Sequence, residues 1–273
     1  MARRPAIKIE EDPDLSVVGS YVDFVEWQLA SRRFASKSER TRARLKVAAA
    51  RILEKTGFQD MRVSDICEMA GVALGTFYNY FEDKRAIAVD VTLEFGEELY
   101  AVARRVAGGK SAFDAILSTN RFFISIYQRN SGLVRCLIQL DDQVPEFQKR
   151  WREIRARWIA RIAASIAKRS EKPGIDEETR IRVAYILECM VFQHLYDVFV
   201  RREPRLGRMA GSADEIAELV SVLWYRAIYC ENPSPEEISH ARKLLRLRRR
   251  GSADAPHGAS GPQPGPTRLR RVR

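Results

Sequence analysis

Apolar side chains recur every three or four residues along most of the chain, the spacing that lines one face of an α-helix. Glycine and proline interrupt this pattern and indicate helix ends at Gly57, Gly71, Gly108, Gly109, Pro173 and Gly174. The pattern predicts an all-α protein, with helices over residues 15–34, 38–56, 63–70, 76–81, 84–107, 111–129, 133–140, 145–169, 176–200, 214–229 and 234–250.

Residues 63–84 read V-S-D-I-C-E-M-A-G-V-A-L-G-T-F-Y-N-Y-F-E-D-K, which predicts two short helices joined by a turn. The face of the first helix expected to be buried consists of Val63, Ile66, Met69 and Ala70. Gly71 is expected to end this helix in the left-handed conformation, with Val72 behind it in the core. On the second helix Phe77 and Phe81 are expected to point inward. This arrangement is typical of a helix-turn-helix, whose second helix enters the DNA major groove.

The same stretch resembles the TetR family of bacterial transcriptional regulators. The shared pattern is D-I-x-x-x-A-G-V-x-x-G-T-x-Y-x-Y-F-x-x-K, carried by Asp65, Ile66, Ala70, Gly71, Val72, Gly75, Thr76, Tyr78, Tyr80, Phe81 and Lys84. The resemblance implies an N-terminal three-helix helix-turn-helix DNA-binding domain, followed by a helical ligand-binding and dimerisation domain. It also implies that the helix over 84–107 joins the two domains and transmits ligand binding to the DNA through its tilt.

By this resemblance, one set of side chains contacts DNA phosphates and another reads bases. The expected phosphate contacts are Arg40, Arg42, Arg44, Thr76, Tyr78, Tyr80 and Lys84. The expected base contacts are Ser64, Leu74, Gly75 and Asn79. Asn79 suits this role best, because an amide can form two hydrogen bonds with adenine. For each arginine, a solvated helix face is the alternative interpretation.

The chain departs from the family pattern on both sides of the turn. Met61 and Arg62 stand where Thr or Ser often caps the first helix, and Ala73 and Leu74 stand where Ser-Lys often precedes the glycine. The missing lysine removes one expected DNA contact, so the departure bears on the base contacts more than on the fold.

The C-terminal half contains two helices with more apolar surface than one neighbour can cover, over residues 181–200 and 214–229. Two such helices from each of two subunits would form a four-helix bundle, and this is where the family dimerises. We therefore expect a homodimer through residues 176–230.

The resemblance also implies a cavity for a small, mainly apolar effector. The candidate lining residues are Phe122, Phe123, Tyr127, Trp151, Trp158, Cys189, Phe192, His194 and Tyr196. Aromatic residues at helical spacing also commonly form plain core, and His194 in particular is typical of a satisfied core histidine.

The net charge of +11 is concentrated at particular parts of the chain. Residues 242–273 hold ten Lys/Arg and one Asp, residues 32–85 hold twelve Lys/Arg against seven Asp/Glu, and residues 86–241 hold 22 of each sign. The excess positive charge therefore belongs to the DNA-binding part and the tail, as expected for a protein that binds nucleic acid.

Several other classes of protein are disfavoured by the sequence. The apolar run over 183–200 is interrupted by charged and polar residues, and residues 1–15 lack a signal-peptide core, so we expect a cytoplasmic protein without a membrane span. The four cysteines and three histidines are too scattered for a metal site, and no cofactor is expected. No catalytic motif such as G-x-S-x-G or a glycine-rich phosphate loop is present, which disfavours an enzyme.

These expectations divide the chain into an N-terminal extension with an amphipathic helix (1–37), the DNA-binding domain (38–84), an effector-binding and dimerisation domain (85–232), a basic helix (233–250) and a disordered basic tail (251–273). The N-terminal helix either packs on the protein itself or its dimer mate, or contacts a partner or membrane surface. The tail either adds phosphate attraction or solubilises the chain. The expected function is a repressor released from a palindromic operator by an effector, and the alternative is an architectural or adaptor DNA-binding protein without an effector.

Overall fold

The computed structural model describes residues 14–109, 111–168, 175–209 and 211–246, and within these ranges the chain forms helices and connecting turns without a β-strand. In order, the elements are α1 (Leu15–Val18), α2 (Tyr21–Ser31), α3 (Lys37–Thr56), α4 (Val63–Ala70), α5 (Leu74–Tyr78), α6 (Lys84–Val106), α7 (Ala112–Arg129), α8 (Ser131–Gln143), α9 (Pro145–Ala167), α10 (Glu177–Leu195), the π-helical turn η1 (Tyr196–Val200), α11 (Pro204–Met209), α12 (Ala213–Tyr229), and the 3₁₀ turns η2 (Pro235–Glu237) and η3 (Ala241–Arg246). The predicted all-α class is confirmed. The expected disorder of 1–14 and 251–273 concerns residues outside the described ranges, apart from Asp14.

The N-terminal segment forms two helices, so the single helix predicted over 15–34 is wrong. Gly19 has a φ of 74°, and its N–H donates to the carbonyl of Leu15 at 2.8 Å, which ends α1. Ser20 then caps α2, which stops at Ser31. The apolar period continues across the break because both helices pack on the same surface, whereas the left-handed residue interrupts the backbone.

Both N-terminal helices pack on the protein's own body, which agrees with one of the two expected roles of this segment. Leu15 is fully buried, and the ring of Tyr21 meets Phe95 of α6 edge to face at 5.1 Å. The buried side chain of Asn130, between α7 and α8, accepts the Tyr21 N–H at 2.6 Å and donates to the Gly19 carbonyl at 2.8 Å. The segment is thereby fixed to the α7–α8 junction.

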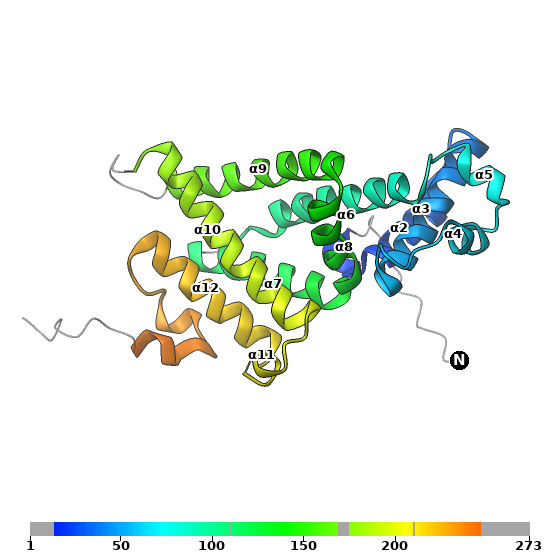
Figure 1. The fold of residues 1–273 in the computed structure, drawn as a ribbon. Coiled ribbons are helices and arrows are strands. Elements are labelled where there is room, and N and C mark those ends of the chain that lie inside the picture. The colour runs from blue at the N-terminus through cyan, green and yellow to red at the C-terminus, as the bar shows by residue number, and fades with distance from the viewer. Residues whose placement is uncertain (1–13, 110, 169–174, 210, 247–273) are drawn as a thin grey trace, which may run out of the picture.

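Helices α3, α4 and α5 form a unit at one end of the molecule (Figure 1). Ser36 caps α3 by accepting the Glu39 N–H at 3.1 Å, so the helix begins at Lys37, one residue before the predicted range. Gly57, with a φ of 83°, ends α3 as predicted. Helix α4 packs on the long α3, and α5 contacts α4, which is the arrangement of a helix-turn-helix.

Helix α6 runs from this unit into the larger body (Figure 1). Asp83 caps it as predicted, by accepting the Ala86 N–H at 2.8 Å. A glycine at 96 lets α6 approach α9 closely, because a Cβ on Gly96 would overlap the indole of Trp151. Helix α6 thus contacts both α3 and the helices of the body.

The larger body consists of α7, α8, α9, α10 and α12, with α7 packed beside α12 and α9 beside α10 (Figure 1). The stripe predicted on α9 is buried throughout, at Phe147, Trp151, Ile154, Trp158, Ile162 and Ile166. Its aromatic members lie in the middle of the body, where a ligand cavity is expected.

The C-terminal segment does not form the continuous helix predicted over 234–250. It contains the short turns η2 and η3, and residues 247–250 lie outside the described ranges. Glu218 of α12, 2% exposed, accepts the backbone N–H groups of Ser239, His240 and Ala241. These bonds hold the chain against α12 between the two turns. In a continuous helix the same N–H groups would donate to backbone carbonyls and could not all bond Glu218.

Candidate nucleic-acid interface and ligand cavity

The first short helix ends at Gly71 as the sequence predicts, but the second helix predicted over 76–81 is wrong in its bounds, because α5 begins at Leu74 and ends at Tyr78. Gly71 adopts the left-handed conformation, with a φ of 63°, and its N–H donates to the carbonyl of Glu68 at 3.1 Å. Phe77 and Phe81 are buried as expected, which anchors α5 and the residues that follow it in the core. Val72 is only half-buried.

The buried face of α4 differs from the prediction at one position. Met69 is 48% exposed, and Cys67 is buried instead. A helix this short packs on α3 over a narrow face, and that face falls on Ile66, Cys67 and Ala70. No side chain caps the start of α4, which agrees with Arg62 standing in the cap position.

The candidate base contacts lie on the outer surface of this unit. Leu74 is 53% exposed at the start of α5, and Asn79 is exposed at its end. Gly75 has open space around it, because an added Cβ would meet no atom within 4 Å. Ser64 on α4 is exposed, and its hydroxyl donates to Asp65 at 3.0 Å. The four residues are therefore accessible to a bound duplex.

The candidate phosphate contacts fall into two groups. Tyr78, 55% exposed, and Arg40 project outward, whereas Thr76 and Tyr80 are half-buried. The remaining cations of this set, Arg42, Arg44 and Lys84, make contacts within the protein.

These inner contacts hold the reading helices in place. Arg42 pairs with Asp90 of α6 at 2.5 Å and lies over the ring of Phe81. Arg44 donates to the carbonyl of Ala70, at the end of α4. The Lys84 ammonium donates to the carbonyl oxygens of Gln59 and Met61, at 3.0 and 3.1 Å. In this conformation the three cations position the unit, so any phosphate contact by them depends on the N–H groups that these bonds leave free.

A cavity of about 380 Å³ lies inside the larger body, in the size range of small-molecule sites. Five of the nine candidate effector residues line it, namely Phe123, Tyr127, Trp151, Trp158 and Phe192. Further lining residues that the sequence did not single out include Tyr100, Asn120, Val134, Leu137, Glu188 and Trp224.

The other four candidates lie outside the cavity wall. Phe122 is buried in the core, and Tyr196 stacks on Phe192 from η1. The Cys189 thiol lies 3.9 Å from Arg155. His194 is half-buried, its Nε2 has no hydrogen-bond partner, and burial lowers its pKa below the ordinary value of 6.5.

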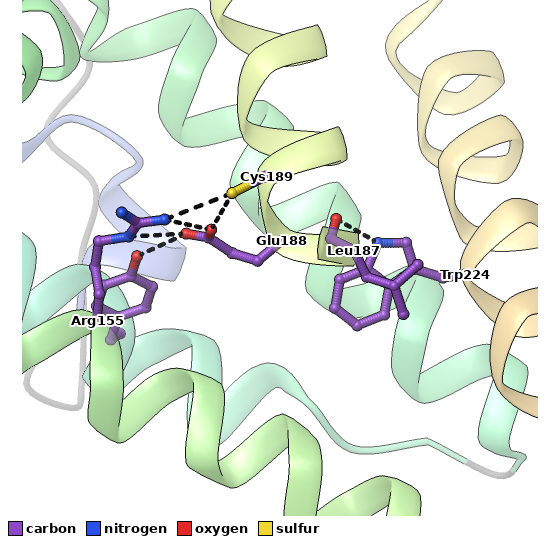
Figure 2. Close-up of polar contacts among 6 residues, drawn as sticks. Arg155, Leu187, Glu188, Cys189 and Trp224 are labelled. Carbon is purple, nitrogen blue, oxygen red and sulfur yellow. Dashed lines mark hydrogen bonds and ion pairs between the residues drawn. The ribbon is translucent and has the colours of Figure 1, made fainter. Parts of the chain in front are cut away.

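Glu188, which lines the cavity, forms an ion pair with a residue behind the wall, shown in Figure 2. Arg155 of α9 donates to Glu188 of α10 at 2.6 Å, and the hydroxyl of Tyr100 lies 3.5 Å from the same carboxylate. Burial, together with the nearby carboxylate, raises the pKa of Tyr100, so its hydroxyl stays protonated. The only sequence signal for this ion pair is an acidic residue inside an otherwise apolar helix.

Helices α10 and α12 lie side by side and leave apolar side chains uncovered. The indole N–H of Trp224 on α12 donates to the carbonyl of Leu187 on α10 at 3.2 Å (Figure 2). The exposed apolar side chains of these two helices are Ile181, Tyr185, Ile186, Leu219 and Leu223.

One segment of the described chain, Glu177–Val200, is long and apolar enough to cross a membrane, and 33% of its most apolar window is buried. Length and composition alone are weak grounds for a membrane span, because core helices meet the same criteria. Within this segment Glu188 forms its ion pair with Arg155 inside the protein.

Comparison with known proteins places these features in one family. Residues 46–91 match the bacterial regulatory proteins of the tetR family. The HTH-type transcriptional regulator EthR of Mycolicibacterium smegmatis is 24% identical over 196 residues, which span 68% of this chain and 85% of the relative.

Solved structures share the fold at low sequence identity. A transcriptional regulator from Pseudomonas aeruginosa PAO1 has a TM-score of 0.59 at 14% identity, covering 80% of this chain and 98% of that one. FadR from Bacillus subtilis, solved in complex with stearoyl-CoA, has a TM-score of 0.51 at 17% identity. The match covers 68% of this chain and 97% of the FadR chain. Residues 46–91 therefore carry the DNA-binding segment of the tetR family of bacterial regulatory proteins, and the described chain shares the fold of solved transcriptional regulators.

Proposed function

We propose that this protein is a homodimeric transcriptional repressor, acting in the cytoplasm, that binds a palindromic operator and leaves it when a small, mainly apolar effector enters the cavity. The proposal rests on one observation, that a single chain combines exposed side chains on α4 and α5 with a partly open aromatic cavity in the body. Because α6 contacts both parts, it is the natural connection between them.

The DNA part of the proposal rests on the outward side chains of α5. Asn79 and Leu74 contact base edges, Tyr78 contacts phosphate, and Arg40 adds positive charge at the start of α3. Arg42, Arg44 and Lys84 hold the unit in shape, so their contribution to affinity is partly indirect.

The effector part rests on the cavity. An architectural DNA-binding protein does not need an aromatic cavity of this size, so the cavity favours a ligand-responsive regulator over that alternative. The stearoyl-CoA bound to FadR supports an amphipathic effector by analogy, since that protein shares the fold.

The dimer part rests on the uncovered face of α10 and α12. Exposed apolar residues on two adjacent helices suit a two-fold four-helix bundle, which would bury them against their own copies. The pair Ile186→Glu and Leu223→Glu should convert a dimer into monomers by light scattering, whereas Val17→Glu, an exposed apolar site at the other end of the chain, should not.

The deciding experiment for the whole proposal is selection of genomic fragments bound by the purified protein, followed by footprinting. A regulator protects two symmetric half-sites about 34 Å, or one helical turn, or a multiple of that apart. The genes beside the protected site then suggest candidate effectors, and release of the fragment by one of them supports the repressor mechanism. Failure to enrich any fragment contradicts the proposal.

A further inference from the structure

The wall of the cavity contains one acidic residue and two basic residues, Arg161 and Lys168, among mainly aromatic and aliphatic ones. Glu188 is 7% exposed, and it is the one carboxylate among the described residues that line the cavity. Burying a carboxylate is costly unless its charge and its hydrogen-bonding capacity are both met. The hydrogen-bond partners of Glu188 therefore indicate how much of the carboxylate's hydrogen-bonding capacity remains for a ligand.

Arg155 meets the charge of Glu188 from one side. Its Nη2 donates to Oε2 at 2.6 Å, and its guanidinium lies 5.3 Å from the ring centroid of Tyr185. Because Arg155 is not among the lining residues, the guanidinium approaches the carboxylate from outside the cavity. The ion pair as a whole is neutral, so it offers a cationic ligand no net attraction.

The other carboxylate oxygen is poorly satisfied. Oε1 lies 3.4 Å from Nε of Arg155 and 3.5 Å from the hydroxyl of Tyr100. Hydrogen bonds to a charged oxygen normally measure about 2.7–2.9 Å, and such an oxygen has room for two donors. Oε1 is thus a strong acceptor that no described donor approaches closely (Figure 2).

Flat aromatic surfaces lie next to this acceptor. The ring of Tyr100 stacks on Trp151 and Trp158, with centroid distances of 5.8 and 5.3 Å. All three residues line the cavity. The site therefore offers an aromatic guest apolar contact over its faces and one strong acceptor at its edge.

We propose that the effector is a mainly aromatic molecule with a hydroxyl or N–H group that donates a hydrogen bond to Glu188 Oε1. The inference rests on the proposed function, because it assigns the chemistry of the effector that fills the same cavity. Glu188 then determines specificity, since a ligand without the donor displaces water from the carboxylate and leaves its oxygen unsatisfied.

Two probes that differ by one methyl group test this assignment in the full-length protein. 2-Naphthol offers an O–H donor, and 2-methoxynaphthalene keeps the ring and the oxygen but cannot donate. By isothermal titration calorimetry the wild type should bind 2-naphthol about tenfold more tightly or better, as expected for a hydrogen bond to a charged group. In the double variant Arg155→Met and Glu188→Leu the preference should fall to near parity, with binding of 2-methoxynaphthalene retained.

A matched variant controls for the loss of an ion pair. Arg157 pairs with Glu97 at 2.5 Å between α9 and α6, and both side chains are exposed, so Arg157→Met with Glu97→Leu should leave the preference unchanged. Removing both members of each pair avoids a buried unpaired charge, and circular dichroism checks folding.

The outcomes separate the inference from the proposed function. Equal binding of the two probes by the wild type overturns the inference and leaves an effector cavity in place. If the folded double variant with Glu188→Leu keeps the preference for 2-naphthol, the inference is also overturned. If that variant does not fold, the relative affinity of the wild type for the two probes tests the inference alone. Binding of neither probe counts against both the inference and the cavity as an effector site for aromatic guests.

Discussion

The carboxylate of Glu54, near the end of α3, accepts the backbone N–H of Leu133 in the first turn of α8 at 2.9 Å. It accepts the N–H of Gly132 at 3.0 Å as well. Helix α8 also lines the ligand cavity through Val134 and Leu137. The DNA-binding unit and the cavity are therefore joined at the start of one helix, and a ligand that displaces α8 acts directly on α3.

Within α8, no capping side chain takes the place of Glu54 as acceptor for these N–H groups. Asn130 occupies the cap position but its side chain makes no capping bond, because it is bonded to the N-terminal segment. Gly132 lies so close to the backbone of Glu54 that a Cβ there would overlap it. Two unsatisfied N–H groups at a helix start would follow from the loss of Glu54.

The first prediction concerns the stability of this joint. Glu54→Ala should lower the free energy of unfolding by about 1–3 kcal/mol, because it leaves buried N–H groups without acceptors. Gln59→Ala, which removes an exposed contact with Gln143, should stay within about 0.5 kcal/mol of the wild type. Urea denaturation measures both, and equal stability of the two variants would show that the joint contributes nothing.

The second prediction separates phosphate contact from base reading. Tyr78→Phe should weaken binding to all DNA sequences alike, because it removes the exposed hydroxyl that we propose contacts DNA phosphate. Asn79→Ala should change which base is preferred at one position of each half-site, at a cost of about 1–3 kcal/mol for the preferred base. Quantitative binding to an operator library distinguishes the two, and an unaltered base profile for Asn79→Ala refutes its role as a reader.

Substitution of Lys84 does not by itself test a phosphate contact. Because its ammonium bonds the carbonyls of Gln59 and Met61, Lys84→Ala changes the loop before α4 as well as any phosphate contact. Reduced DNA binding by that variant would not identify a phosphate contact, whereas Arg40→Ala removes an exposed charge with no internal bond among the described residues.

Local sequence patterns predicted the helices well, because each buried face repeats within a few residues. The turn at Gly71 and the inward Phe77 follow from spacing and backbone geometry alone. Contacts between distant positions left no such signal. Arg155, for example, pairs with Glu188, 33 residues away on another helix.

The same limit explains the other differences. Glu54 and Gly132 are 78 residues apart, and no local sequence pattern in either segment predicts their contact. Helical periodicity also continued through Gly19 and through the C-terminal segment, where backbone geometry and the carboxylate of Glu218 override it.

The third prediction concerns pH. Burial lowers the pKa of His194 in the folded state, so below pH 6.5 the unfolded chain binds a proton more readily than the folded one. The free energy of unfolding should therefore fall as the pH drops from 6.5 through the lowered pKa. Replacement by His194→Gln should reduce that loss in urea titrations between pH 7.5 and 5.5. An identical pH dependence of wild type and variant would contradict the assignment.

The fourth prediction concerns the C-terminal segment. Glu218→Ala should release residues 239–246, because three backbone N–H groups lose their acceptor. Trypsin should then cleave faster at Arg242 and Lys243 than in the wild type. Glu215→Ala, which removes the capping partner at the exposed start of α12, serves as the comparison and should leave cleavage at these sites unchanged.

The central claim is that the chain is a sequence-specific regulator, and one comparison of affinities tests it most directly. A selected operator fragment and an unrelated fragment of equal length are titrated with the protein at one physiological salt concentration. The account predicts a preference for the operator of about 10³ or more, typical of specific recognition. Equal affinity for both fragments, with the same steep salt dependence, would mean that charge alone binds the DNA and would contradict the account.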